Sequence, residues 1–205
     1  MLKITFLGTG TSQGIPVVGS NHPVCLSLNK KDKRLSSSFL IQWNNWSYVV
    51  DTGPDFRQQM LREGCNRIDG VLYTHEHSDH TSGIDDLRAF CFKQGETPIY
   101  AHSRVIQSLN NRFEYIFNDK KKYSGAPLLK PIEVFENLDF KISKLTVTPI
   151  SYLHASLQVY GYRLNNFAYL TDLKTIDDRE LKKLENLDIL AVSYTHLRAH
   201  ETRNN

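Results

Sequence analysis

Three histidines and an aspartate fall within six consecutive residues, 75–80, directly after a short apolar run. His75, His77 and Asp79 occupy every second position, and His80 follows at once. A strand that runs into a tight loop lets such side chains converge on one or two metal ions, because zinc, iron and manganese all accept imidazole nitrogen and carboxylate oxygen. The spacing therefore predicts a metal centre rather than a polar surface loop.

The apolar run at residues 71–73 is predicted to be the strand that delivers this motif. Periodicity predicts further strands at residues 2–7, 38–42, 48–50, 99–101, 140–142, 145–150, 159–164, 167–170 and 189–192. It predicts helices at residues 55–63, 84–92, 104–117 and 177–184. This mixture predicts an α/β fold with two sheets packed face to face and helices outside.

Composition narrows the class of protein. The chain has 205 residues, 40% of them hydrophobic, which suits one well-buried core and hence one domain. A net charge of +3 neither marks a nucleic-acid binder nor excludes one. The three cysteines are odd in number and widely spaced, so no disulfide framework is implied. With neither a signal peptide nor an apolar run of roughly 18 residues, a soluble cytoplasmic protein without membrane contact is expected.

The segment THEHSDH at residues 74–80 resembles the signature of the metallo-β-lactamase superfamily. The strand and loop at residues 6–12 resemble the opening of its phosphodiesterase branch, and residues 49–53 resemble the strand whose Asp51 supports the metal loop. His154 resembles an isolated histidine ligand, and residues 169–172 resemble the strand that ends in a bridging aspartate. The resemblance covers about residues 1–191 and is strongest to the PhnP-type phosphodiesterases, with the tRNA 3′-processing nucleases as nearby relatives.

The resemblance implies a four-layer αββα sandwich whose last strand and helix region is incomplete. It also implies two divalent metal ions, for which zinc, manganese and iron all suit the donor set. Carried over by position, His75, His77 and His154 hold one ion, Asp79 and His80 hold the other, and Asp172 bridges them. Asp79 and Asp172 are the implied catalytic residues. Asp51 is expected either to orient a ligand histidine or to cap a strand-to-helix turn.

The expected function is that of a metal-dependent hydrolase, a phosphodiesterase that cleaves a small cyclic phosphate ester with a metal-bound hydroxide. Alternatives on the same fold are an RNA 3′-end nuclease, a lactonase or a thioesterase. A nuclease would carry a basic docking arm, and the three lysines at residues 120–122 are the only candidate, which favours a small phosphate-ester partner over nucleic acid. A homodimer stays open, as does an inactive metal-binding module.

Two segments depart from the family. Relatives carry several cysteines for a structural zinc in the loop at residues 19–25, whereas Cys25 and His22 supply half a tetrahedral site, so Cys25 is predicted to be a plain loop thiol. Residues 192–205 resemble the translation of a sequencing adapter and are expected to be a non-native tail, with the hydrolase domain at residues 1–191. His196 and His200 are therefore not assigned as the further histidine that relatives supply to the second metal.

Overall fold

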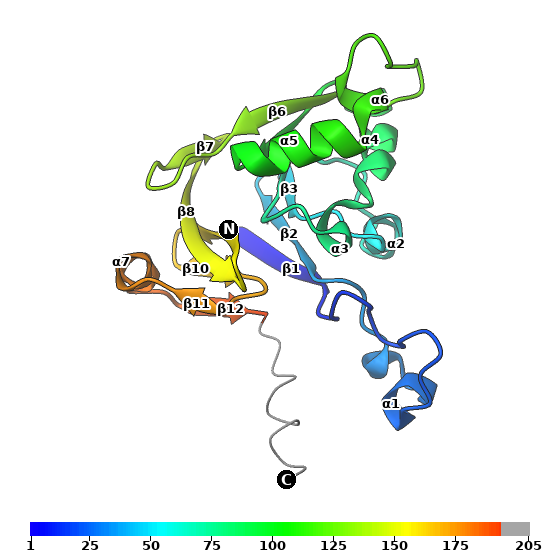
Figure 1. Ribbon diagram of the computed structural model, residues 1–205, viewed down its shortest axis with the longest axis vertical. Coiled ribbons are helices and arrows are strands. Elements are labelled where there is room, and N and C mark those ends of the chain that lie inside the picture. Colours follow the sequence, from blue (N-terminus) through cyan, green and yellow to red (C-terminus); the bar gives the residue numbers. More distant parts are fainter. Residues whose placement is uncertain (194–205) are drawn as a thin grey trace. The chain divides into compact units, whose positions relative to one another are not determined.

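The computed structural model describes residues 1–193 and divides into two compact units, Met1–Val134 and Phe135–Asn205. Each unit has one β-sheet with its own helices (Figure 1). The predicted single domain over residues 1–191 stays a prediction. Of the predicted tail, residues 194–205, which include His196 and His200, lie outside the described residues. Among residues 1–193, no helix has the length and apolar character needed to cross a bilayer.

The first unit is built on a six-stranded sheet in the order β1-β2-β3-β4-β5-β6. Strands β1 to β3 pair antiparallel, and β3 to β6 pair parallel. The carboxyl ends of β3, β4 and β5 therefore meet at one edge of the sheet, the position at which parallel sheets usually bind ligands. The strands are β1 (Leu2–Gly8), β2 (Ser38–Trp43), β3 (Trp46–Val50), β4 (Gly70–Leu72), β5 (Thr97–Ala101) and β6 (Leu129–Glu133).

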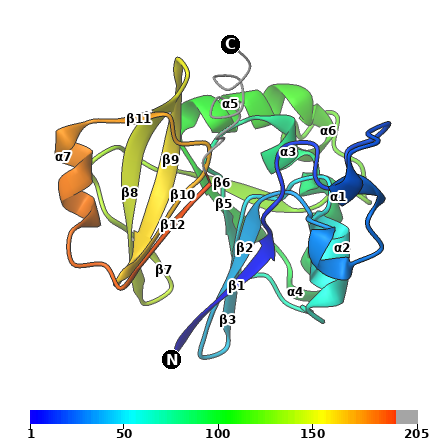
Figure 2. The same ribbon diagram turned by 90° about the horizontal axis from the view of Figure 1, so that it is seen from below.

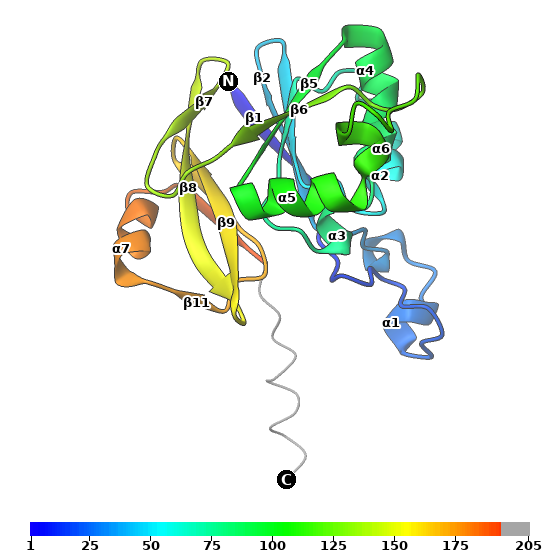
Figure 3. The ribbon, with the colours of Figure 1, turned by 45° about the horizontal axis from the view of Figure 1, so that its top comes forward.

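Helices pack against one face of this sheet, because apolar residues of the helices and of the strands belong to the same buried cluster. Figure 3 shows α2, α4 and α6 together on that side. Their contact residues meet strand residues Leu40, Val49, Val71 and Ile99 in one buried core. The helices of this unit are α1 (Pro23–Leu26), α2 (Phe56–Arg62), α3 (Ser78–Thr81), α4 (Arg88–Gln94), α5 (Ser103–Arg112) and α6 (Glu114–Phe117), with 3₁₀ turns at Lys30–Asp32 and Ile84–Leu87.

Three features of the first unit differ from the sequence-based expectation. The predicted helix at residues 104–117 is broken at Phe113, which leaves the helical conformation (φ −123°, ψ 47°) and packs against the core. Strand β6 was not predicted, because Pro131 and two exposed neighbours hide its apolar pattern. Proline is tolerated in this strand because β6 lies at the edge of the sheet. Residues 15–35, where no strand or helix is predicted, carry α1 and extend away from the sheet (Figure 1).

The second unit is a sheet in the order β11-β8-β9-β10-β12, with β7 also paired to β8 (Figure 2). β8 and β10 both run antiparallel to β9, so their carboxyl ends lie at the same edge. Ile150, Tyr152, Val159, Ala168 and Leu170 form its buried cluster. Its elements are β7 (Phe140–Ile142), β8 (Leu145–His154), β9 (Leu157–Leu164), β10 (Phe167–Leu170), β11 (Thr175–Ile176), α7 (Asp178–Leu181), a 3₁₀ turn at Lys182–Leu184, and β12 (Ile189–Val192).

Candidate metal centre

The predicted motif lies at the carboxyl edge of the first unit's sheet. β4 ends at Leu72, and residues 74–81, here called the metal loop, follow Tyr73; the second half of this loop is the short helix α3. The loop begins in register with the sheet because the Tyr73 amide donates to the Tyr100 carbonyl at 2.9 Å. Its far end is held by the neighbouring turn, since the Thr52 amide donates to the His80 carbonyl at 2.8 Å. Backbone hydrogen bonds therefore fix both ends of the loop.

Asp51 organises the interior of the metal loop. It follows β3, is fully buried, and has a left-handed backbone (φ 61°) that turns its carboxylate toward the loop. One oxygen, Oδ1, accepts from the Thr74 amide at 2.9 Å. The other, Oδ2, accepts from the Thr74 hydroxyl at 2.8 Å and from His80 Nδ1 at 2.7 Å. The residue that caps α2 is Asp55, so the Asp51 carboxylate serves the metal loop and not the start of that helix.

These contacts set the tautomers of two of the histidines. His80 donates its Nδ1–H to Asp51, so its Nε2 keeps a lone pair. The Thr74 hydroxyl donates to Asp51 and lies 3.0 Å from His75 Nδ1, so it accepts from that nitrogen, and His75 Nε2 also keeps a lone pair. A buried carboxylate thus sets the tautomer of His80 directly and of His75 through Thr74, as carboxylates behind metal-bound histidines do.

The candidate ligand atoms occur as two close pairs. His75 Nε2 and His77 Nδ1 lie 3.0 Å apart, and His80 Nε2 and Asp79 Oδ2 lie 3.2 Å apart. Two nitrogens each about 2.0–2.1 Å from a tetrahedral zinc ion are separated by roughly 3.3 Å. The donor types and their separations therefore suit one cation at each pair.

The electrostatics of the loop keep Asp79 ionised. Burial acts to raise the pKa of Asp79, but when the His80 ring carries a second proton, on Nε2, its hydrogen bond and charge outweigh burial and hold that pKa below its usual value. For Asp51, complete burial raises the pKa, while His80 and Thr74 oppose the rise. A ligand must be deprotonated to bind a cation, and Asp79 meets this requirement near neutral pH.

Gly53 allows the turn after β3 to touch the metal loop. A Cβ atom at this position would lie 2.1 Å from the Asp79 carbonyl oxygen, a backbone atom that can move only if the loop moves. The sequence DTG at residues 51–53 marks a turn, but only the structure shows that the glycine is required by this contact.

Gly53→Ala is therefore expected to displace Asp79 and to lower the free energy of unfolding by about 1–3 kcal/mol. Urea unfolding and bound-metal analysis measure the two effects. Gly64→Ala is the matched control: its Cβ would meet nothing within 4 Å, but its φ of +59° imposes a left-handed cost of about 1–2 kcal/mol. A Gly53→Ala protein that binds metal as tightly as Gly64→Ala would contradict this role.

The remaining predicted ligands lie in the second unit. His154 ends β8, and Asp172 follows β10, so both are at the same edge of that sheet. Asp172 has a left-handed backbone (φ 55°), as Asp51 has, and the Tyr152 hydroxyl donates to the carbonyl of the preceding Thr171 at 2.7 Å. The structure therefore brings together Asp51, His75, His77, Asp79 and His80 in one unit, and His154 and Asp172 at one edge of the other.

The N-terminal arm does not form a comparable site. Among the described residues, Cys25 and His22 belong to no group of three or more side chains able to hold a metal ion. His22 Nδ1 instead accepts from the Val24 amide at the start of α1. His102, which follows β5, has a similar role at the start of α5, where it accepts from the Arg104 amide.

Thr74, Thr81 and Arg112 are the supporting residues that sequence reasoning missed. Thr74 stands beside the motif, but its double role depends on Asp51, 23 positions earlier. Arg112 reaches the metal loop from 36 positions away, and no local pattern signals that contact.

Comparison with known proteins places these observations in a family. The sequence profile of a family described as beta-lactamase superfamily domain matches residues 47–204. A crystal structure of a diphosphatase from the PhnP family is 34% identical, covers 93% of this chain and 73% of that one, and superposes with a TM-score of 0.84. Zn²⁺-bound PqqB from Methylobacterium extorquens, at 19% identity, shares the fold with a TM-score of 0.74 over 94% of this chain and 72% of its own.

A curated relative shows that such a sequence also occurs within a longer protein. An octanoyltransferase from Porphyromonas gingivalis is 40% identical over 94% of this chain. The chain spans only 39% of that relative's length, so most of the relative has no counterpart here.

Proposed function

Because the chain belongs to the beta-lactamase superfamily and has its metallo-β-lactamase fold, we propose that it is a metal-dependent phosphodiesterase acting on a small phosphate ester. The observation that carries the proposal is the pair of ligand sets on the metal loop, oriented by the buried carboxylate of Asp51. Likeness to a diphosphatase of the PhnP family supports a phosphate-bearing substrate, and the form that we propose is a small cyclic phosphate ester of the phosphoribosyl type.

The proposed ligands are those carried over from the family. His75, His77 and His154 would hold one divalent ion, Asp79 and His80 the second, and Asp172 both. Zinc and manganese suit these donors best, and iron is compatible with them. Two such ions would lower the pKa of water from about 15.7 to about 7 and neutralise charge on the phosphate oxygens.

The residues of this chain then have separate tasks. Asp79, ionised near neutral pH, orients the attacking water through a carboxylate oxygen and accepts its proton. Asp51 holds His80 in the tautomer with Nε2 unprotonated, which keeps that nitrogen available as a ligand. Tyr73 stays a neutral phenol, since burial raises its pKa well above the usual range, and it bonds to Thr52 below the loop.

The test is hydrolysis of bis(p-nitrophenyl) phosphate and of a ribose 1,2-cyclic phosphate by the purified chain with added Mn²⁺ or Zn²⁺. We expect turnover of both esters that stops when a chelator is added and returns when the metal is restored. An RNA with a 3′ extension, a lactone and an acyl thioester are assayed in parallel. Preference for one of these three, or metal-independent turnover, would overturn the proposal.

A further inference from the structure

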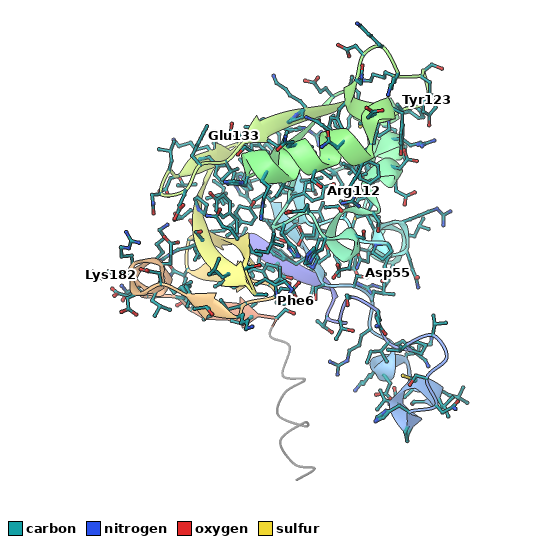
Figure 4. All side chains as sticks on the ribbon, viewed as in Figure 1. Phe6, Asp55, Arg112, Tyr123, Glu133 and Lys182 are labelled. Atoms are coloured by element: carbon teal, nitrogen blue, oxygen red, sulfur yellow. The ribbon has the colours of Figure 1, made fainter. Side chains whose placement is uncertain are left out.

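We propose that α5 clamps the metal loop and that Arg112 is a positioning residue for the His75/His77 metal. The inference rests on the proposed function for its metal, but its evidence is separate. Arg112 ends α5 (Figure 4). Its Nη1 donates to the Glu76 carbonyl at 2.6 Å and to the Thr81 hydroxyl at 3.0 Å. Arg104, near the start of the same helix, forms an ion pair with the Glu76 carboxylate at 3.3 Å. One helix therefore holds both the backbone and the side chain of the residue between His75 and His77.

Thr81 extends this clamp to His77. Its hydroxyl accepts from Arg112 and donates to the His77 carbonyl at 2.8 Å. The carbonyl oxygens of Glu76 and His77 are consecutive along the chain, and each accepts a hydrogen bond from this pair. The Glu76 carbonyl belongs to the peptide plane before the His77 Cα and the His77 carbonyl to the plane after it, so the two hydrogen bonds fix both planes and hence the point from which the His77 side chain departs.

His77 depends on this support more than the other histidines do. His75 and His80 are 0% and 2% exposed, and their rings are oriented by Thr74 and Asp51. His77 is exposed, so packing cannot fix its ring to the same degree. A preorganised site holds each ligand within roughly 0.5 Å of its productive position. For an exposed side chain such as His77, holding the backbone is the remaining way to achieve this.

α5 is suited to this task because it is firmly seated. Val105 and Leu109, on its inner face, are fully buried in the core of the first unit. Arginine is also the suitable donor, since its planar fork presents several N–H groups in a fixed geometry, whereas lysine offers a single flexible point charge. Arg112→Met should therefore loosen the His75/His77 ligand pair while leaving His80, which Asp51 supports, in place.

The test is a titration of the metal-free full chain with Co²⁺, followed by its visible absorption bands. His77→Ala and His80→Ala identify which bands belong to each ligand pair. The Co²⁺ binding that disappears in His77→Ala is binding at the His75/His77 pair. We expect Arg112→Met to lower the Co²⁺ affinity of that pair by about tenfold, the low end of the effect of supporting residues on metal affinity. The event lost in His80→Ala should be unchanged, and Arg112→Lys should fall between Arg112→Met and the unmodified chain.

Arg179→Met is the matched control, because Arg179 is an exposed arginine of α7 paired with Asp177. It should leave both binding events unchanged. Equal Co²⁺ affinity in Arg112→Met and Arg179→Met, or equal weakening of both events, would overturn the clamp. If Arg112→Met does not fold, Arg112→Lys is used in its place. An unchanged Co²⁺ affinity of the His75/His77 pair in Arg112→Lys would then overturn the role proposed for Arg112. Absence of any Co²⁺ binding by the unmodified chain would instead refute the proposed function.

Discussion

His77→Ala and Asp172→Ala are each expected to abolish metal-dependent phosphodiester hydrolysis while leaving the protein folded. His77 Nδ1 is one of two nitrogens that face a single position, so its removal leaves His75 without its partner on the metal loop. Asp172 is the proposed ligand to both ions, so its loss removes negative charge from both. We expect kcat/KM to fall by at least about 10²–10³-fold, the effect of removing one strong electrostatic stabiliser of a transition state.

The measurement is steady-state hydrolysis of bis(p-nitrophenyl) phosphate with saturating Mn²⁺, paired with circular dichroism and thermal unfolding. His22→Ala is the control, because that histidine is exposed and only caps the short helix α1. Its activity should match the unmodified chain. Turnover within a few-fold of the control in either variant would refute the role assigned to that residue.

Asp51→Asn is expected to weaken metal binding by about 10–100-fold, although no ligand is changed. All three groups that meet the Asp51 carboxylate are donors, namely the Thr74 amide, the Thr74 hydroxyl and His80 Nδ1. The amide nitrogen of asparagine must face at least one of them. If it faces His80, the imidazole moves its proton to Nε2, and the nitrogen that should bind the cation becomes a donor.

A titration with Zn²⁺ or Co²⁺ measures this loss, and Asp69→Asn serves as its control. Asp69 is also a buried carboxylate that accepts a backbone amide, from Ser47 at 2.8 Å, and pairs with Arg67. Both substitutions should lower the free energy of unfolding by about 1–3 kcal/mol. Only Asp51→Asn should weaken metal binding, and an equal metal affinity in the two variants would show that Asp51 has no special role.

The sequence by itself determined the chemistry of the metal loop. Residue types and spacing are enough to indicate His75, His77, Asp79 and His80 as candidate ligands, and the strand that precedes them is a local apolar run. Most strands and helices could likewise be predicted, because their periodicity is also local. The helix break at Phe113 and the edge strand β6 could not, since the core and the neighbouring strand impose them.

Tertiary structure alone decided how the ligands are oriented. The tautomer of His80 depends on a carboxylate 29 positions earlier, and the backbone of His77 on a contact between Thr81 and an arginine 31 positions later. Such contacts follow from the parallel pairing of β3, β4 and β5, which sets three loops at one edge of a sheet. Local spacing can name the candidate metal ligands, but hydrogen bonds between distant segments fix the tautomers of His75 and His80.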